Sequence, residues 1–441
     1  MNKMLMNNRI AKNASWIIIC RIVQSVLNLA VTMITARYLG PSNYGLITYA
    51  SSIVAFIVPV VQLGLNGILV QEFVDSPSDS GKIIGTATIL CTISSILGVI
   101  GIWAFTSIVN RGETDTIIVS VLYSISMFFQ MTEMIQYWYQ SKLISKYVSV
   151  VSLISRTIVS VYKIYIVIAG KNIYWFAIVN SLDYFIISIC LFAIYFRLSG
   201  PKLTFSLTES KRMLAKSKHF IIAGLMVSVF GQTDRIMLKL MIDDAASGYY
   251  SAAITCAGMT VFLFSAIIDS FRPVIFEHKK NNNESYKKNT ILLYSIIIYM
   301  ALAQSIVLTI AAKPIIWLLY GEAYAPATEV LRIVTWYSAF SYIGSARGIW
   351  FLAEGKHKYI WITNAIGAII NVIGNFMLIP TLGPCGAALT SVITQIFTNF
   401  IIGLLITPIR DSSLWMIEAL NPNVLLDLIS LVKGKNNKRL S

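Results

Sequence analysis

One apolar stretch long enough to be a membrane-spanning helix, residues 218–241, contains four side chains that are out of place in hydrocarbon. The segment "FGQTDRIMLKLM" carries Gln232, Asp234, Arg235 and Lys239. Steps of three and four residues put Arg235 on one helix face with Gln232 and Lys239, whereas Asp234 lies about 100° round the helix. Arginine binds phosphate oxygens through a planar fork and stays protonated. The spacing therefore predicts a wet helix face that binds an anionic group, with Asp234 as an internal partner or coupling residue.

The energetic cost of these charges indicates that they do not face lipid. An arginine or lysine at mid-bilayer costs roughly 2.5–3.5 kcal/mol on insertion scales. Arg21, Arg156, Lys163 and Arg235 lie deep in apolar stretches, so each needs water or a partner. Lys239 and Arg272 lie nearer the ends of theirs and could also reach the interface by extending their side chains.

Similar polar stripes occur on other predicted helices. Serine and threonine on such stripes can bond their own backbone carbonyls or pack helices together, but this does not account for Arg21, Arg235 and Asp269. The predicted ligands on the stripes are Arg21, Asn28, Gln62, Gln232, Arg235, Lys239 and Arg272. Asp234 and Asp269 are the predicted coupling or ion-pair acids.

A second set of charges lies on neighbouring predicted helices. Arg156 and Lys163 are two turns apart and share a face, Asp183 on the next helix is a partner for them, and Glu133 can pair with either base. A structural ion pair and a role in a cavity both remain open for this set.

The composition indicates the fold class. Of 441 residues, 56% are hydrophobic and 12% charged, about half the charged fraction of a soluble domain. The apolar residues form runs of roughly 20, the length that crosses a bilayer as a helix. We therefore predict an all-α polytopic membrane protein; the alternating strands of a β-barrel are absent. The five cysteines are scattered, so neither a metal site nor a disulfide framework is expected, and the basic N-terminus precedes an apolar run too long for a cleaved leader.

Twelve spans are expected, and the basic residues orient them. The spans cover residues 14–36, 45–65, 83–109, 117–139, 147–169, 174–196, 218–241, 249–274, 290–312, 327–350, 359–380 and 385–408. With the N-terminus inside, only Arg37, Arg111, Lys171 and Lys313 fall in the outer loops. The positive-inside rule then places both termini in the cytoplasm. Most of the net charge of +15 comes from basic residues in the predicted cytoplasmic segments. Membrane orientation explains it, and no nucleic-acid partner is needed.

An internal repeat divides the chain into halves. "WYQSKLISKY" (Trp138–Tyr147) aligns with "WFLAEGKHKY" (Trp350–Tyr359), and "YGLITYASS" (Tyr44–Ser52) aligns with "SGYYSAAIT" (Ser247–Thr255). Six spans in each half make two parallel repeats, as in alternating-access transporters. The predicted boundaries are an N-terminal lobe 1–196, a basic cytoplasmic linker 197–217, a C-terminal lobe 218–408 and a basic tail 409–441. For the tail, an interfacial helix and a dangling cytoplasmic segment both remain open.

Five motifs, in order along nearly the whole chain, resemble one known family. They are the two Trp–Lys–Tyr segments above, "LGPSNYG", "GQTDRIML" and "LIPTLGPCGAALTSVITQI". Together they resemble the polysaccharide biosynthesis protein family, the Wzx-type O-antigen and capsular repeat-unit flippases of the multidrug/oligosaccharidyl-lipid/polysaccharide exporter superfamily. The resemblance implies a V-shaped pair of six-helix lobes around a basic cavity. The positions that align with Arg156 and Lys163 are Ala368 and Asn375, so the charge is not symmetric between the halves, and the resemblance does not assign the phosphate ligand.

The resemblance implies the substrate and the setting. The substrate would be an oligosaccharide on undecaprenyl pyrophosphate, moved to the periplasmic leaflet of a bacterial inner membrane for O-antigen, capsule or exopolysaccharide assembly. A polysaccharide polymerase and a chain-length regulator are the implied protein partners. No cofactor is expected, and coupling to H⁺ or Na⁺ is not required, because an inside-negative potential already favours outward movement of a negative group.

Three alternative functions require different residues. A cation-coupled multidrug exporter would favour an acidic cavity, whereas bases outnumber acids within these spans. A flippase for another lipid-linked glycan, such as a teichoic acid or peptidoglycan precursor, fits the chemistry, although peptidoglycan-precursor flippases usually have two further spans. A membrane polymerase or ligase needs catalytic residues on substantial loops, but the longest outer loop is Lys313–Pro326, and no acid/His constellation occurs there. We therefore expect no enzymatic activity.

Overall fold

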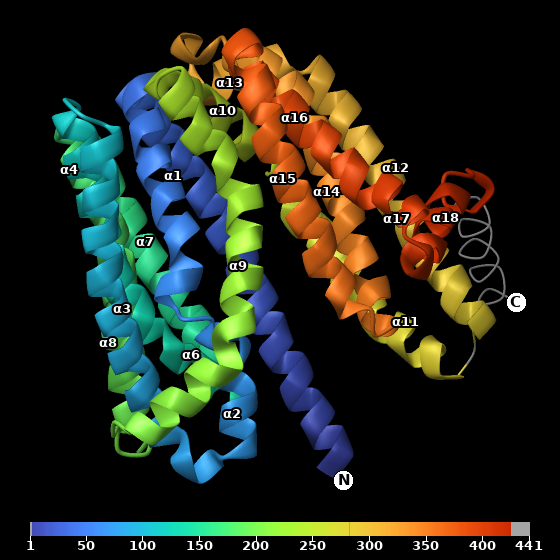
Figure 1. The fold of residues 1–441 in the computed structure, drawn as a ribbon. Coiled ribbons are helices and arrows are strands. Elements are labelled where there is room, and N and C mark those ends of the chain that lie inside the picture. Colours follow the sequence, from blue (N-terminus) through green and yellow to red (C-terminus); the bar gives the residue numbers. More distant parts are fainter. Residues whose placement is uncertain (1, 282, 425–441) are drawn as a thin grey trace, which may run out of the picture. The chain divides into compact units, whose positions relative to one another are not determined.

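The computed structural model describes residues 2–281 and 283–424, and every regular element in them is a helix (Figure 1). Within these residues nine helices are long and apolar enough to cross a membrane. A tenth is added if α10 (Asp244–Ala257) and α11 (Val261–Asn281), which are bent by 46° at a short break, count as one span. The all-α polytopic class predicted from composition is confirmed.

The number twelve stays a prediction. The helix α1 (Asn2–Val61) contains two predicted spans, 14–36 and 45–65, on either side of a break at Gly40 (φ 71°, ψ 171°). Glycine tolerates this positive φ, and Pro41 disfavours helical geometry in the residue before it. The predicted span 327–350 lies in α14 (Ala327–Ala353), which carries Glu329, Arg332 and Arg347 and is not among the helices apolar enough to be counted.

The chain forms two compact units, residues 1–248 and 249–441. The remaining elements of the first unit are η1 (Leu65–Gly67), α2 (Leu69–Asp75), η2 (Pro77–Asp79), α3 (Ser80–Val109), α4 (Thr114–Ser124), α5 (Ser126–Gln130), η3 (Met131–Glu133), α6 (Met134–Ser141), α7 (Lys146–Ile168), α8 (Ile173–Arg197) and α9 (Leu207–Met241). The predicted span 117–139 is thus broken into α4, α5, η3 and α6.

The helix α9 begins inside the predicted linker. The Ser206 hydroxyl accepts a hydrogen bond from the Glu209 backbone N–H at 3.3 Å, which caps the first turn. Residues 207–217 are therefore helical, and α9 packs against α1 within the first unit. The lobe boundaries at 196 and 218 stay a prediction.

Two glycines that the repeat alignment pairs lie against each other in the first unit. A Cβ on Gly45 would stand 2.9 Å from the Gly248 nitrogen and 1.7 Å from the Asp244 carbonyl oxygen. A Cβ on Gly248 would stand 2.1 Å from the Pro41 carbonyl oxygen. Only glycine permits this close approach of the two backbones.

The second unit contains the rest of the helices. They are α12 (Asn283–Ile310), α13 (Ala312–Tyr320), η4 (Glu322–Tyr324), α14, α15 (His357–Leu382), α16 (Pro384–Ile396), the π-helical η5 (Phe397–Ile401), α17 (Ile402–Leu405), η6 (Thr407–Ile409) and α18 (Arg410–Glu418). The core is built on aromatic side chains, and the rings of Phe264 and Tyr342 stack at 4.0 Å.

A buried cation holds the end of the second unit together. Arg347 of α14 is 1% exposed, and its Nη1 donates to the carbonyl oxygens of Thr398 and Asn399 in η5, each at 3.0 Å. Its Nε donates to the Ser412 hydroxyl of α18 at 3.1 Å. The first part of the predicted tail is therefore a packed helix rather than a dangling segment, and the basic run from Lys433 onward lies outside the described residues.

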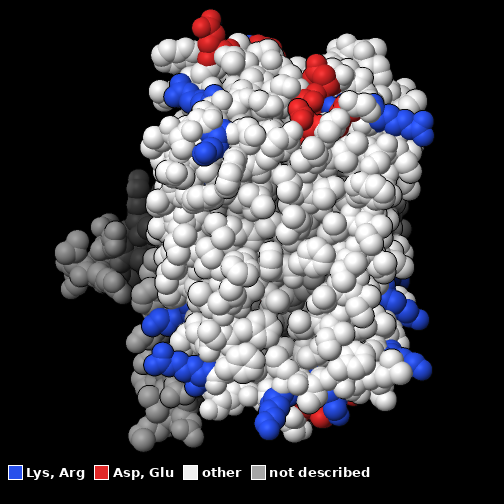
Figure 2. Space-filling model, turned by 90° about the vertical axis from the view of Figure 1, so that its left-hand side faces the viewer, with Lys and Arg blue, Asp and Glu red and all other residues white. Residues whose placement is uncertain are grey.

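The outer surface is apolar where a membrane would contact it. On α3 the side chains of Ile93, Leu97, Ile100 and Trp103 are more than half exposed and recur at helical spacing. On the face that Figure 2 shows, the charged side chains of described residues gather at the two ends and leave a broad uncharged band between them. This distribution is typical of helices that face lipid.

A network of charges ties α9 to α2 at one end of the first unit. The Glu72 carboxylate is 4% exposed and accepts from Arg212 Nη2 at 2.6 Å and from Lys216 Nζ at 2.7 Å. Burial alone would raise the pKa of Glu72, but the hydrogen bonds from Lys216 and Arg212 outweigh it and hold the pKa below its usual value.

We predict that Glu72→Gln lowers the stability of the protein by about 1–3 kcal/mol at pH 7, because two cations lose a charged acceptor. Because the pKa of Glu72 is lower in the folded protein, its ion pairs contribute their full stability above the pKa of the unfolded chain, about 4.3. That stability is lost as the pH falls through the pKa of the folded protein. Thermal unfolding of both proteins in detergent at pH 7 and pH 4 measures it. Equal midpoints at pH 7 would contradict the prediction, and Lys82→Gln, which removes an exposed ion pair with Asp79, is the matched control.

Candidate functional site

The polar stripe of α9 is packed partly against α1. The Ser228 hydroxyl donates to the Ala55 carbonyl of α1 at 3.1 Å. One turn earlier, a Cβ on Gly224 would stand 2.8 Å from Pro59. Small residues on both helices let the backbones approach, so this edge of the stripe serves helix packing.

Arg235 and Gln232 lie one turn further along α9 and contact each other. Arg235 Nη1 donates to Gln232 Oε1 at 3.2 Å, and both side chains are half-buried. Arg235 also lies close enough to Tyr123 of α4 for an electrostatic interaction. Asp234, the residue before it, is buried. Arg235 and Gln232, which the sequence put on one helix face, therefore contact each other, and their role as ligands stays a prediction.

Lys239, predicted as a third ligand on this face, is held in a network of ion pairs. Its side chain is 5% exposed, and its Nζ lies 2.6 Å from Glu113 Oε2 and 3.0 Å from Asp244 Oδ2. Two carboxylates neutralise its charge, so Lys239 connects α9 to the segments that carry Glu113 and Asp244. We call this its tether role. Sequence reasoning missed both acids, because they lie just outside the spans, where acidic residues are ordinary.

Glu113 is the centre of a wider network at the start of α4. Its Oε2 also accepts from the Thr116 hydroxyl at 2.8 Å and from Asn110 Nδ2 at 3.3 Å, and Asn110 Oδ1 accepts from the Tyr49 hydroxyl at 2.9 Å. Burial alone would raise the pKa of Glu113, but the hydrogen bonds from Lys239 and Thr116 hold it below its usual value. The network joins α1, α4 and α9 and lies at the opposite end of α9 from Glu72.

The other predicted ligands lie on other segments of the chain. Asn28 is exposed on α1 and Gln62 is half-buried just beyond its end. Arg272 of α11 is exposed and forms a 3.1 Å ion pair with Asp269 one turn away. The Arg21 side chain lies outside the described residues.

The second predicted set does form a cluster in the first unit. The Ser155 hydroxyl of α7 donates to Asp183 Oδ1 of α8 at 2.6 Å. Glu133 lies close enough to Asp183 and Arg156 for their charges to act on one another, and Lys163 is in the same relation to Asp183 and Arg156. The four charged residues thus lie within reach of one another's charges, and whether they serve as structural ion pairs or in a cavity stays open.

We predict that Lys239→Gln destabilises the protein by about 2 kcal/mol, less than for a fully enclosed pair because Glu113 is partly exposed. The loss follows because two neighbouring carboxylates would remain without their cation. Thermal unfolding in detergent measures it, with Arg272→Gln as the control for removal of an exposed ion pair. A Lys239→Gln protein as stable as the control would contradict the tether role and favour the role of Lys239 as a ligand.

The comparisons with known proteins follow this geometry. The chain is 22% identical over 394 residues to the capsular polysaccharide biosynthesis protein CapF of Staphylococcus aureus, a match that covers 87% of this chain and 96% of CapF. It is 26% identical over 234 residues to an uncharacterized membrane protein of Methanocaldococcus jannaschii, covering 49% of this chain and 45% of that protein.

Solved structures share the fold. The lipid II flippase MurJ in an inward closed conformation matches with a TM-score of 0.72 at 16% identity, over 94% of this chain and 92% of that chain. An inward-facing multidrug resistance MATE transporter of the MOP superfamily matches with a TM-score of 0.67 at 14% identity, over 89% of this chain and 95% of that chain. These likenesses support a multi-pass membrane protein with the MOP fold.

The family model described as polysaccharide biosynthesis protein matches residues 10–279. The matched part includes all of α9 with Arg235 and Gln232, and it is more than half of the chain. The chain therefore belongs to the polysaccharide biosynthesis protein family.

Proposed function

We propose that this protein is a flippase that moves undecaprenyl-pyrophosphate-linked oligosaccharide repeat units from the cytoplasmic to the outer leaflet of a bacterial inner membrane. Family membership and the likeness to CapF support a role in polysaccharide assembly, and the likeness to MurJ supports a fold suited to flipping. The observation that carries the proposal is the half-buried Arg235, paired with Gln232 inside an apolar helix.

Arg235 is the proposed ligand of the pyrophosphate. A guanidinium binds phosphate oxygens bidentately, and the amide of Gln232 both orients it and offers hydrogen bonds to sugar hydroxyls. Arg21, Asn28, Gln62 and Arg272 stay in the proposal as further polar residues along the path. Lys239 is reassigned to the network that anchors α9.

Membrane potential supports the direction of movement. A group of about two negative charges moving outward gains roughly 2.3 kcal/mol per charge per 100 mV when the inside is negative. A coupling ion is therefore not required, and Asp234 and Asp269 are the acids available should H⁺ or Na⁺ take part. The cluster of Glu133, Arg156, Lys163 and Asp183 is proposed to be internal to the first lobe.

Topology and organisation follow the loop charges. The proposal keeps both termini in the cytoplasm, with the lobes, linker and tail bounded as predicted from the sequence. On this topology the network of Glu72, Arg212 and Lys216 lies on the cytoplasmic side, and that of Glu113 and Lys239 on the outer side. A polymerase and a chain-length regulator remain the proposed protein partners, and no enzymatic activity is proposed.

A cation-coupled multidrug exporter is the second candidate, because the MATE structures share the fold. Carriers of organic cations favour acidic cavities, whereas bases outnumber acids within the predicted spans. A deletion strain with altered drug susceptibility and normal surface polysaccharide would favour the exporter. Accumulation of another lipid-linked glycan would identify a teichoic acid or peptidoglycan precursor as the substrate.

We predict that Arg235→Ala abolishes surface polysaccharide while the protein still inserts into the membrane at normal levels. Arg235→Lys keeps the charge without the fork and should restore polysaccharide only in part. Immunoblots of membranes and of extracted surface polysaccharide measure the two quantities. Arg197→Ala, at an exposed position at the end of α8, is the matched control, and normal polysaccharide in the Arg235→Ala strain would refute the proposed role.

A further inference from the structure

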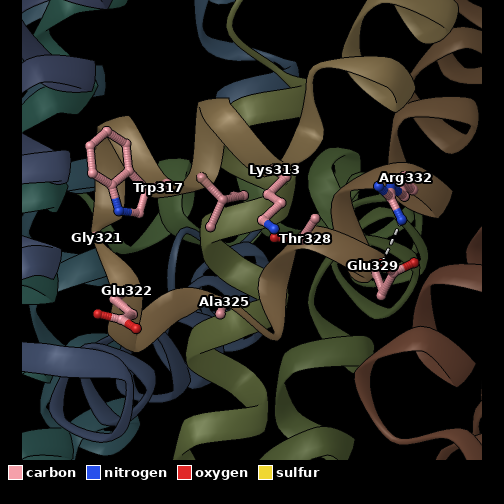
Figure 3. Close-up of a pocket in the computed structure, with 9 residues that line it drawn as sticks. Lys313, Trp317, Gly321, Glu322, Ala325, Thr328, Glu329 and Arg332 are labelled. Carbon is pink, nitrogen blue, oxygen red and sulfur yellow. Dashed lines mark hydrogen bonds and ion pairs between the residues drawn. The ribbon is translucent and has the colours of Figure 1, made fainter.

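A pocket in the second unit is lined by none of the residues assigned to the proposed site. It has a volume of about 590 Å³ and is formed by α13, η4 and the first turns of α14 (Figure 3). Figure 3 shows the Trp317 ring at one end, the Glu329–Arg332 pair at the other, and Lys313 between them beside Thr328. Glu322 lies on the turn below Trp317.

The walls of the pocket are held by buried aromatic side chains. Gly321 has a φ of 86°, which a residue with a side chain rarely adopts, and it turns the chain sharply between α13 and η4. Tyr320 and Tyr324, on either side of the turn, are buried, and their rings lie 5.2 Å apart. These buried rings pack beneath the turn that carries Gly321 and Glu322 of the lining, and a lining held by packing lowers the entropy cost of binding.

Two of the charges in the pocket, Lys313 and Glu322, lie at opposite ends of α13 and do not stabilise it. Lys313 lies in the first turn of α13 and Glu322 just beyond its last, each at the end where the helix dipole disfavours its charge. Among the described residues neither forms an ion pair. Glu329 and Arg332 pair with each other at 2.6 Å. Two charged groups are thus left for a ligand, in a pocket whose lining carries two bases and two acids.

We infer that this pocket binds the neutral sugar portion of the glycan. An exposed indole offers a flat apolar face for a sugar ring, and Glu322, Lys313 and Thr328 offer an acceptor, a donor and a hydroxyl for its hydroxyl groups. Trp317 is 65% exposed, so its ring is accessible. A lining with balanced charge does not favour a pyrophosphate, which selects a surplus of positive charge.

The position in the fold suits a glycan that has already crossed. The pocket lies at the far end of α12 from the basic residues Lys279 to Lys288, which the positive-inside rule places in the cytoplasm. This step rests on the proposed function: on the outer side, the pocket holds the sugar as the lipid-linked unit leaves the protein.

The experiment is a binding titration with the full chain in detergent. The probe is the repeat-unit oligosaccharide of the producing strain, released from its lipid by mild acid and free of phosphate, and the readout is saturation-transfer NMR. We expect Trp317→Ala to weaken binding about tenfold and Glu322→Gln to weaken it by a smaller factor. Trp361→Phe, which changes another exposed tryptophan of the same unit, should leave the affinity unchanged.

Three outcomes would overturn the inference. They are no binding by the wild type, equal binding by wild type and Trp317→Ala, and displacement of the sugar by inorganic pyrophosphate. Equal binding would make Trp317 an anchor at the membrane interface. If the oligosaccharide binds at Trp317 but a deletion strain still displays polysaccharide, the flippase proposal fails and the sugar pocket stands. If the deletion strain loses its polysaccharide but the oligosaccharide does not bind, the flippase proposal stands and the sugar pocket fails.

Discussion

Hydrocarbon offers no hydrogen bonds, so every charge inside the apolar helices of this chain needs partners from the chain itself or access to water. Three buried charges show how such partners are supplied. Lys239 lies between two carboxylates, and Arg347 donates to two carbonyl oxygens and a hydroxyl. Glu72, on the short helix α2 between two spans, lies between two cations. Arg235 is only half-buried, and its Nη1 donates to the neutral amide oxygen of Gln232.

This constraint explains how α9 is positioned. One end is tied to α2 through Glu72, the middle to α1 through Ser228, and the other end to α4 through Glu113. Arg235 lies on α9 between Ser228 and Lys239. The contacts of these two residues fix the rotation of α9 and its position along its axis, and therefore the direction of the Arg235 side chain. A precise site needs this support from its surroundings more than it needs additional ligands.

The sequence predicted the class of fold, the deep charges and their helix faces, because periodicity and hydropathy depend only on local order. It put Arg156 and Lys163 on one helix face for the same reason, because helical steps fix which residues of one helix are neighbours, and it offered Asp183 of the next helix as a partner. It did not find Glu113 and Asp244 beside Lys239, since acids at the ends of spans are common and their contacts depend on how the helices pack. It also treated Leu207–Ser217 as linker, although the capping pair Ser206 and Glu209 marks a helix start there.

The setting of Arg347 has a consequence for how the protein is made. Its guanidinium enters the interior with α14, but one of its acceptors, the Ser412 hydroxyl, belongs to α18 and is synthesised 65 residues later. Since chains emerge from the ribosome in order, the hydrogen bonds of Arg347 are complete only once α18 has been synthesised. A chain that ended before α18 would leave the Arg347 Nε without its hydroxyl acceptor.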